Sequence, residues 1–468
     1  MNRSFSNSIA ASAGTRRFWR GHSLRIHLRS WISTTLIVAS IGSVRSESTG
    51  DRLRTEIAAA ASGGTVRVPA GDYEGPFTLS KPLHLIGEPG AVLRGNRHGH
   101  VVLVRASDVE VAGFVVRGSG RNLSDDEAAI HITGARAIIR GNRIFDMLHG
   151  IYVRKANDCQ ILDNVIVGDG AATDVVADPT ISGLKAGDAA SGELCSVPDP
   201  QDRRGNGLHL WNSSGHLIAR NVIRGTRDGI YFSFTTHTLT RDNQIRHVRY
   251  GLHYMYSNEN VFERNVFSDN AAGAALMYSK NLVLRENWFV SNRSHRAYGL
   301  LLQSIDDTRI EANTIEGNTL GLFLENGNNN TVRGNRITGN YVGLRISDST
   351  ADSRFFENTI AGNIHPIETT GANAANIWAV AGRGNYWDDA SSLDLNRDGV
   401  ADLPHREPDL FGVWRRTFPA IGLLSASPGE RLLRLIHSRL IVPGIPGITD
   451  PRPLVIPRSL PLAEFSKP

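Results

Sequence analysis

The sequence predicts an all-β protein, a right-handed parallel β-helix in which coils of about 22 residues stack on one another. The first observation is a recurring Asn that is followed, two residues later, by an apolar residue. Its copies lie mostly 22 residues apart, at Asn142, Asn164, Asn221, Asn243, Asn265, Asn287, Asn313, Asn335 and Asn358. The second observation is a Gly, eight residues after most of these Asn, that opens an alternating apolar run such as YGLHYMY (250–256). A unit this short cannot bury its apolar face alone, so neighbouring units must stack.

The alternation within each run indicates which side chains face the interior. Counting from the Gly, the first and third residues are mostly aliphatic or aromatic, and the second and fourth residues face outward. Because stacked coils lie about 4.8 Å apart, each Asn can hydrogen-bond to its copies above and below, and Asn tolerates left-handed backbone geometry. A second column follows five residues after the first, at Asn270, Asn292, Asn318, Asn340 and Asn363.

The N-terminal region differs from the repeat. Residues 1–46 combine a basic stretch with a short apolar run, Trp31 to Val44, and predict a cleaved export signal peptide; an uncleaved membrane anchor is the alternative. Residues 47–63 predict a helix, Asp51 to Ser62, that caps the first coil and has Asp51 as its N-cap.

The remaining segments follow from the extent of the repeat. Coils are expected over residues 64–384, with an insertion at 168–205. An acidic loop and a connector are expected over 385–424. A helix and an irregular Pro-rich tail are expected over 425–468.

Charge and cysteine content restrict the function. The chain has 51 basic and 46 acidic residues, but residues 1–46 hold seven Arg and no acid, which leaves 44 basic and 46 acidic residues beyond them. Net charge therefore gives no support for nucleic-acid binding. The two cysteines, Cys159 and Cys195, fit an exported protein with one disulfide, or both are reduced.

The outward positions bring rare sulfur side chains together. Met255 and Met277 occupy the fourth position of adjacent coils, in a chain with only four Met. His253 precedes Met255 by two residues and faces the same side, and His209 lies two coils earlier at the position of His253. Thioether and imidazole suit the soft ion Cu(I), which makes these four residues candidate copper ligands. The alternative is an apolar docking patch, covered by a partner protein or by the C-terminal tail.

A second candidate metal site is local in sequence. The loop that begins at Asp394 has oxygen-bearing side chains at positions 1, 3, 5 and 9, a Gly at position 6 and a backbone carbonyl at position 7, which are Asp394, Asn396, Asp398, Asp402, Gly399 and Val400. This spacing allows a short loop to wrap Ca²⁺, although position 12 is His405 rather than the Glu of an EF-hand. The alternative is a solvated Asp/Asn turn.

Catalytic motifs of β-helix enzymes are missing from the sequence. The pectinase pattern of paired Asp with Gly-His-Gly is absent, and Asp306-Asp307 has no His and Arg or Lys set in register. A polysaccharide lyase or epimerase nevertheless remains the alternative function, because fold alone does not exclude it. Four further histidines, expected to be ordinary surface or turn residues, are His247, His295, His365 and His405.

Several segments resemble the NosD family of periplasmic accessory proteins. They are NGLHLWNSSGHLIARNVIRGTRDGIYFSF (206–234), YGLHYMYSNENVFERNVFSDNAAGAALMYS (250–279), YGLLLQSIDDTRIEANTI (298–315), GNYWDD (384–389) and DLNRDGVADLP (394–404). One departure is Pro404-His405, where the family usually has Pro-Tyr.

The resemblance implies a periplasmic protein that is not an enzyme. It implies docking on an ABC transporter made of an ATPase and a membrane subunit, and cooperation with a copper chaperone lipoprotein. The expected role is assembly of the copper–sulfide centre of nitrous oxide reductase in denitrifying bacteria. The protein is expected to help deliver copper, sulfur or both to this centre, and to bind copper transiently as Cu(I).

Overall fold

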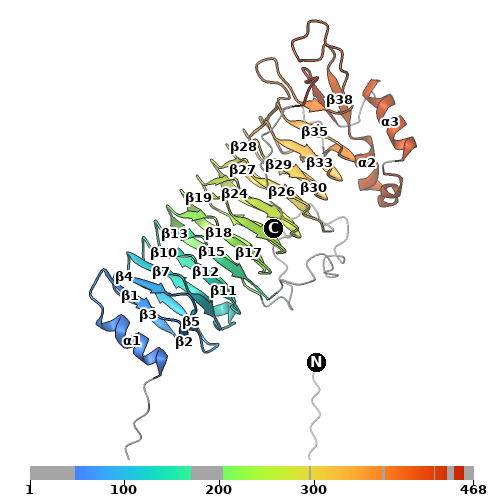
Figure 1. Ribbon diagram of the computed structural model, residues 1–468. Coiled ribbons are helices and arrows are strands. Elements are labelled where there is room, and N and C mark those ends of the chain that lie inside the picture. Colours follow the sequence, from blue (N-terminus) through green and yellow to red (C-terminus); the bar gives the residue numbers. More distant parts are fainter. Residues whose placement is uncertain are drawn as a thin grey trace, which may run out of the picture. The chain divides into compact units, whose positions relative to one another are not determined.

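The computed structural model describes residues 48–169, 204–294, 297–370, 375–425, 427–439 and 447–457 (Figure 1). The chain divides into two units, Met1–Ser46 and Glu47–Pro468, and every described residue belongs to the second. The predicted signal peptide, Cys195 and nearly all of the predicted insertion lie outside the described residues. None of the described helices is both long and apolar enough to cross a membrane.

The described strands form a parallel β-solenoid, which confirms the predicted fold class. Each coil adds one strand to each of three parallel sheets, and strands three apart in sequence are hydrogen-bonded neighbours. The first sheet consists of β1 (Gly64–Val68), β4 (Leu83–Gly87), β7 (Val109–Ala112), β10 (Ile138–Arg140), β13 (Gln160–Leu162), β16 (Leu217–Ala219), β19 (Leu239–Arg241), β22 (Val261–Glu263), β25 (Val283–Arg285), β28 (Arg309–Glu311), β31 (Thr331–Arg333) and β34 (Arg354–Phe356).

The second and third sheets follow the same order, except that β37 pairs with β35. The second consists of β2 (Gly71–Glu74), β5 (Ala91–Arg94), β8 (Val115–Arg117), β11 (Arg143–Phe145), β14 (Val165–Val167), β17 (Val222–Arg224), β20 (Gln244–Arg246), β23 (Val266–Ser268), β26 (Trp288–Val290), β29 (Thr314–Glu316), β32 (Arg336–Thr338), β35 (Thr359–Ala361) and β37 (Tyr386–Trp387). The third consists of β3 (Phe77–Leu79), β6 (Val102–Val104), β9 (Ala128–Ile132), β12 (His149–Arg154), β15 (Leu208–Ser214), β18 (Asp228–Thr236), β21 (Tyr250–Met255), β24 (Ala272–Lys280), β27 (Tyr298–Asp306), β30 (Leu320–Glu325), β33 (Val342–Ile346) and β36 (His365–Thr369).

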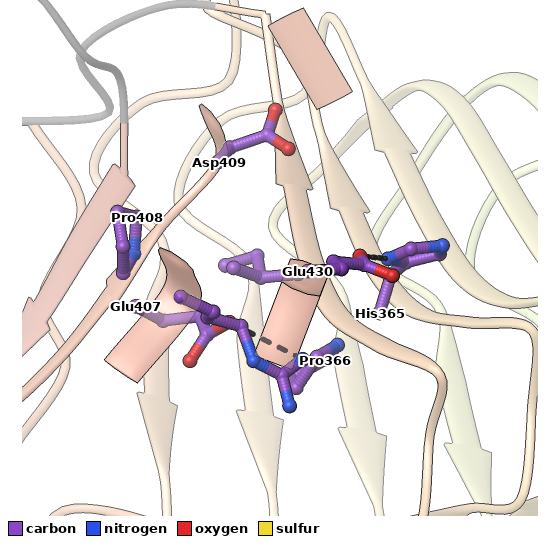
Figure 2. A pocket seen from close by; sticks show the side chains of 8 residues that line it. His365, Pro366, Glu407, Pro408, Asp409 and Glu430 are labelled. Carbon is purple, nitrogen blue, oxygen red and sulfur yellow. Dashed lines mark ion pairs between the residues drawn. The ribbon is translucent and has the colours of Figure 1, made fainter. Parts of the chain in front are cut away.

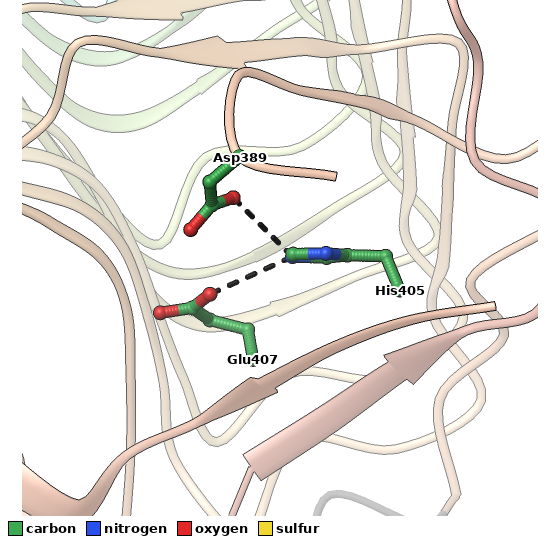
Figure 3. Close-up of side chains that lie close together, drawn as sticks. All are labelled: Asp389, His405 and Glu407. Atoms are coloured by element: carbon green, nitrogen blue, oxygen red, sulfur yellow. Dashed lines mark ion pairs between the residues drawn. The ribbon is translucent and has the colours of Figure 1, made fainter. Parts of the chain in front are cut away.

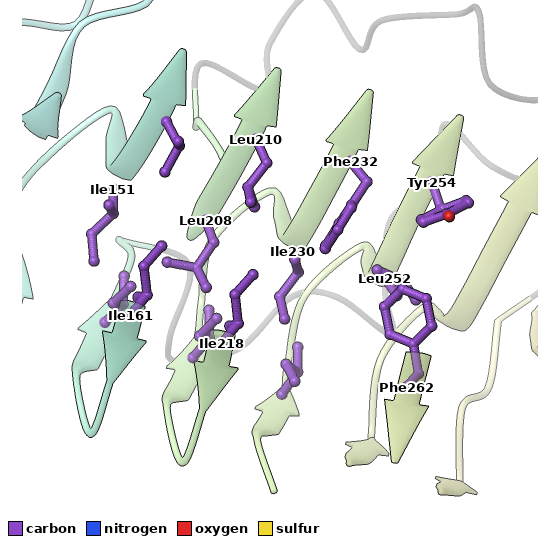
Figure 4. Close-up of a cluster of buried hydrophobic side chains, with 14 of the residues drawn as sticks. Ile151, Ile161, Leu208, Leu210, Ile218, Ile230, Phe232, Leu252, Tyr254 and Phe262 are labelled. Atoms are coloured by element: carbon purple, nitrogen blue, oxygen red, sulfur yellow. The ribbon is translucent and has the colours of Figure 1, made fainter. Parts of the chain in front are cut away.

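One continuous apolar core fills the interior of the coils. Equivalent residues stack from coil to coil, as Ile151, Leu208, Ile230 and Leu252 do, and all four are fully buried (Figure 4). The recurring Gly allows the coils to approach closely: a Cβ at Gly251 would lie 2.4 Å from the carbonyl oxygen of the next copy. The inward positions predicted from the alternation are therefore confirmed.

Hydrogen bonds between stacked asparagines join the coils from within. The backbone N–H and the side-chain amide of Asn243 both donate to Oδ1 of Asn265, at 3.1 and 2.9 Å, and Asn265 repeats the pattern on Asn287. These side chains are fully buried. The left-handed conformation falls on the preceding residue, as at Asp242 (φ 57°) and Arg264 (φ 52°), and not on the Asn as the sequence suggested. The bend at that residue leaves the Asn amide free to align with its copies.

The ladder ends on a carboxylate from the C-terminal tail. Asn385 continues the column beyond the sequence repeat, because it accepts from the N–H and the amide of Asn358. Its own N–H and amide donate to Oδ2 of Asp450, at 2.7 and 3.1 Å, and the indole of Trp387 donates to the same oxygen at 3.0 Å. Burial raises the pKa of Asp450 above its usual value, which these donors partly offset. The C-terminal tail thus supplies the acceptor for the last buried donors of the ladder.

A short helix caps the first coil. Helix α1 (Thr49–Ala59) buries Leu53 and Ile57 against the core. Its N-cap is Ser48, whose hydroxyl accepts from the N–H of Asp51, so the predicted cap at Asp51 is wrong by one turn. Asp51 instead lies in the first turn, where its negative charge interacts favourably with the helix N-terminus.

The other end is covered by segments that lack the repeat. Strands β38 (His405–Pro408) and β39 (Gly447–Asp450) form an antiparallel pair, although the tail was expected to be irregular. Helix α2 (Leu410–Thr417) and the 3₁₀ helix η5 (Pro419–Leu424) follow β38, and helix α3 (Pro428–Arg439) lies in the region expected to be helical. A further 3₁₀ helix, η1, spans Leu123–Asp125. Cys159 is a buried free thiol, and burial raises its pKa to about 11.

Replacing one ladder Asn tests the contribution of these hydrogen bonds. Asn265→Ala leaves a buried N–H of Asn243 without its acceptor, so we expect the free energy of unfolding to fall by at least about 2 kcal/mol. The matched control is Asn96→Ala at an exposed position with one local hydrogen bond, where the loss should stay within about 0.5 kcal/mol. Denaturant unfolding measures both, and equal losses would contradict a structural role for the ladder.

Candidate functional site

Polar and aromatic side chains line a groove on the outer face of the third sheet. The groove has a volume of about 500 Å³ and lies over β12, β15, β18 and β21. Its lining includes Asp126, His149, Tyr152, Arg154, His209, Trp211, Arg227, Asp228, Tyr231, Arg249, His253 and Met255. Three of the four predicted copper ligands, His209, His253 and Met255, therefore line one cavity.

A column of alternating His and Tyr runs along the outer face of the third sheet, and four of its five members line the groove. His131, Tyr152, His209, Tyr231 and His253 occupy the equivalent outward position on five successive strands of the sheet. Their ring centroids are 5.0, 4.5, 4.7 and 4.9 Å apart in that order. The column follows from the 22-residue period, since the side chain at each position stacks on its copy one coil away. It places the ring of Tyr231 between His209 and His253.

A buried carboxylate orients His253. Oδ2 of Asp228 lies 2.9 Å from Nδ1 of His253, and the guanidinium of Arg249 donates to both oxygens of Asp228 at 2.8 Å. Burial alone would raise the pKa of Asp228, but Arg249 and His253 together hold it well below its usual range. Asp228 is therefore a buried anion that fixes the imidazole plane of His253. Sequence inspection missed it, because Asp228 and Arg249 are 21 residues apart and only the coil register brings them together.

Other histidines of the groove are neutral near pH 7. Burial lowers the pKa of His209 to about 3 and that of His149 to about 4. A neutral imidazole keeps one nitrogen lone pair for a metal ion or a hydrogen-bond donor.

The two methionines are neighbours on adjacent strands. Met255 on β21 pairs in register with Met277 on β24, as the 22-residue spacing predicts. The hydroxyl of Tyr231 lies 4.0 Å from the sulfur of Met255. Met255 is half-buried, but Met277 is only 3% exposed and belongs to an outer apolar cluster with Ala275, Leu301 and others.

These outward side chains are more buried than their positions in the repeat predict. The side chains do project away from the core, but neighbouring outward residues pack against one another, so His253 is only 5% exposed. Of the predicted copper ligands, His253, Met255 and Met277 share one region, whereas His209 lies beyond the ring of Tyr231.

In the predicted calcium loop, side-chain carboxylates accept hydrogen bonds from backbone N–H groups of the same loop. The carboxylate of Asp394 accepts from the N–H groups of Asp398 and Gly399, at 3.2 and 2.9 Å. Gly399 has a φ of 83°, which explains the Gly at the sixth position. A carboxylate oxygen of Asp402 accepts from the N–H of Leu395 at 2.7 Å. The oxygen-bearing side chains thus point toward the loop interior.

Two histidines that were expected on the surface are buried where the C-terminal cap meets the last coil, so that expectation is wrong. Nδ1 of His365 lies 3.1 Å from a carboxylate oxygen of Glu430 on α3 (Figure 2). His405 stacks on Trp387, and its Nε2 faces Glu407 and Asp389 (Figure 3). The only signal in the sequence is the two-residue spacing of His405 and Glu407, which puts both on one side of a strand. His247 is exposed at a turn as expected, and His295 lies outside the described residues.

Comparison with solved structures shows the fold. The A-module of the mannuronan C-5 epimerase AlgE6 from Azotobacter vinelandii is similar over 74% of this chain and 97% of the module, with a TM-score of 0.52 and 16% sequence identity.

Comparison of sequences shows the family. The model of the family described as periplasmic copper-binding protein (NosD) matches residues 187–392. A probable ABC transporter binding protein NosD from Stutzerimonas stutzeri is 32% identical over 422 residues, covering 86% of this chain and 89% of that protein. A protein of the same description from Pseudomonas aeruginosa is 33% identical over 402 residues, covering 82% and 87%. Identity at this level over most of both chains means that the chain belongs to the NosD family.

Proposed function

We propose that the chain is a periplasmic accessory protein that docks on an ABC transporter and carries copper toward the copper–sulfide centre of nitrous oxide reductase. Its partners are the ATPase and membrane subunits of the transporter, a copper chaperone lipoprotein and the reductase. The family description supports copper binding, and the names of the relatives support the transporter partner. Residues 1–46 act as the export signal in this proposal.

The observation that carries the copper proposal is the pairing of Met255 and Met277 beside His253. Two thioethers and one imidazole form a soft donor set that suits Cu(I), which is the cargo here. The ring of His253 is also oriented as in metal-binding histidines, because the carboxylate of Asp228 contacts one of its two ring nitrogens. Three protein ligands leave one coordination position open. Such a site releases its ion to a partner more readily than a closed cage.

The partly buried sulfur atoms favour a protected transfer site over an open docking patch. Met277 is covered by the outer apolar cluster, and Met255 stands between that cluster and the groove. Copper would therefore enter from the groove side. His209 is separated from His253 by Tyr231 and is better suited to a second position along the groove than to direct ligation with the methionines.

We also propose that the loop of Asp394, Asn396, Asp398, Val400 and Asp402 binds Ca²⁺ and stabilises the C-terminal cap. Its support is the convergence of the Asp394 and Asp402 carboxylates on the backbone of one short turn. Ca²⁺ takes oxygen ligands from carboxylates, amides and backbone carbonyls, all of which the loop supplies.

A second function is favoured by the composition of the groove. Asp228, Arg249, Tyr231 and His253 together provide a carboxylate, a cation and two groups able to transfer protons. A lyase or epimerase acting on an acidic polysaccharide uses such groups. The test is incubation of the mature protein with polyuronates. Formation of unsaturated or epimerised products that Tyr231→Phe abolishes would replace the transfer role with an enzymatic one; we expect no turnover.

The double variant Met255→Leu with Met277→Leu tests the copper site. Leu keeps the volume and apolarity of Met, so the fold survives while the thioether ligands are lost. We expect Cu(I) affinity, measured against a chromophoric chelator, to fall by at least about tenfold, together with reductase activity in cells at limiting copper. The matched control is Met147→Leu inside the core, which should bind Cu(I) as the wild type does.

Full Cu(I) binding and full reductase activity in the double variant would contradict the copper site and support docking. Met255→Glu separates the two roles further, because Met255 is only half-buried at the edge of the apolar cluster. A charge at this position should disrupt partner binding if this face docks.

Asp394→Asn combined with Asp398→Asn tests the calcium loop. Asn can still accept hydrogen bonds but removes two negative charges, so we expect loss of Ca²⁺ binding by calorimetry and of the stabilisation that Ca²⁺ gives in thermal unfolding. Asp352→Asn, at an exposed turn of the coils, is the control. If the wild type takes up no Ca²⁺ at millimolar concentration, the loop is a solvated turn.

A further inference from the structure

Three side chains of the C-terminal cap converge as metal ligands do. Asp389 follows β37, and His405 and Glu407 project from one side of β38. One ligand atom from each lies within 4.8 Å of the others, and this is the one group of three such residues among the described parts of the chain. Figure 3 shows the two carboxylates on either side of the tip of the imidazole ring.

The separations are too long for hydrogen bonds and suit a shared ion. Nε2 of His405 lies 3.5 Å from Oε2 of Glu407 and 3.7 Å from Oδ1 of Asp389. A charge-assisted hydrogen bond would be about 2.7–2.9 Å long. Two ligands at about 2.0–2.1 Å from a tetrahedral zinc ion lie about 3.4 Å apart. Small movements of the side chains would therefore complete the first coordination sphere.

The facing atoms are buried and lack hydrogen-bond partners. His405 is 7% exposed and Glu407 is 2% exposed. Nε2 of His405 and Oε2 of Glu407 have no hydrogen-bond partner within the part of the chain that the structure describes. The two atoms meet only as an ion pair at 3.5 Å, and buried charged atoms that lack hydrogen bonds are costly, so a ligand shared by both atoms would offset that cost.

The surroundings hold the three ligands in place. Arg434 on α3 approaches the other carboxylate oxygens, Oδ2 of Asp389 at 3.9 Å and Oε1 of Glu407 at 4.0 Å, and so leaves Oδ1 and Oε2 turned toward His405. The ring of His405 stacks on the indole of Trp387 with centroids 4.9 Å apart. Burial raises the pKa of Glu407, a penalty on the carboxylate that a nearby dication would offset.

We propose that Asp389, His405 and Glu407 bind a Zn²⁺ ion that fastens β38 to the last coil of the solenoid. One imidazole and two carboxylates are borderline and hard ligands that suit Zn²⁺, unlike the thioethers near the groove. Asp389 is partly exposed, which gives the ion an entry path and leaves the fourth position to water. This site is independent of the copper proposal, because it shares no residue with the groove.

The competing interpretation is an ion triad in which His405 links the two carboxylates without metal. The two interpretations differ in measurable ways. A triad takes up no zinc, and its stability does not respond to zinc. A metal site adds one bound ion and raises the temperature of unfolding when zinc is supplied.

The experiment uses the mature chain without a histidine tag, stripped with a chelator and titrated with Zn²⁺ against a chromophoric zinc chelator. We expect one tight equivalent in the wild type and an affinity lower by about tenfold or more in Asp389→Asn and Glu407→Gln. Asp389→Asn is the safer variant, because its side chain is 38% exposed. The matched controls are Asp388→Asn on the neighbouring residue and His247→Gln at an exposed turn, which should bind Zn²⁺ like the wild type.

The zinc-dependent rise in unfolding temperature should disappear in Asp389→Asn and persist in both controls. Metal analysis and thermal unfolding on the same samples provide this readout. Absence of a tight zinc equivalent in the wild type, or its retention in Asp389→Asn and Glu407→Gln, would overturn the proposal. Binding of Cu(I) by the methionine pair is measured separately. A negative result for the zinc site therefore does not bear on the copper proposal.

Discussion

The hydrogen bond from one buried asparagine to its copy on the next coil is the constraint on which the molecule depends. Each amide donates to the following copy, so the bonds point the same way from Asn142 to Asn385 and end on the carboxylate of Asp450. A slip by one residue would leave a whole column of buried amides without partners. The ladder thereby fixes the register of all three sheets, including their outer faces.

Fixed register gives the outer face of each sheet an ordered pattern of side chains. The same stacking that aligns Asn243 with Asn265 aligns His209 with Tyr231 and Met255 with Met277. Side chains far apart in sequence then lie one strand spacing apart, and a chemical pattern such as the His–Tyr column accumulates along one face. The register also brings charged residues together, since Arg249 forms an ion pair with Asp228 of the preceding coil. The groove lies on the outer face of the sheet whose inner side chains pack in the core.

The ends of the solenoid obey a different constraint. An open coil exposes strand edges and apolar rows, which helix α1 covers at one end and β38, β39 and α3 cover at the other. The C-terminal cap is rich in buried ionisable groups, such as His365 with Glu430 and His405 with Glu407. Soft donors thus gather on the side of the solenoid, and hard and borderline donors gather at its end. The chemistry of the two regions suits different metal ions.

The sequence by itself determined the solenoid, its inward positions and the adjacency of Met255 and Met277, because one period converts sequence spacing into spatial distance wherever coils repeat. The spacing of oxygen-bearing residues in the sequence also identified the loop that begins at Asp394. The sequence did not determine the burial of Met277, since exposure depends on how neighbouring outward side chains pack. Nor did it reveal that Asp450 closes the ladder or that His405 meets Asp389 and Glu407. Those contacts join the non-repeating tail to the last coil, where no period relates position in the chain to position in space, so only the tertiary structure decided them.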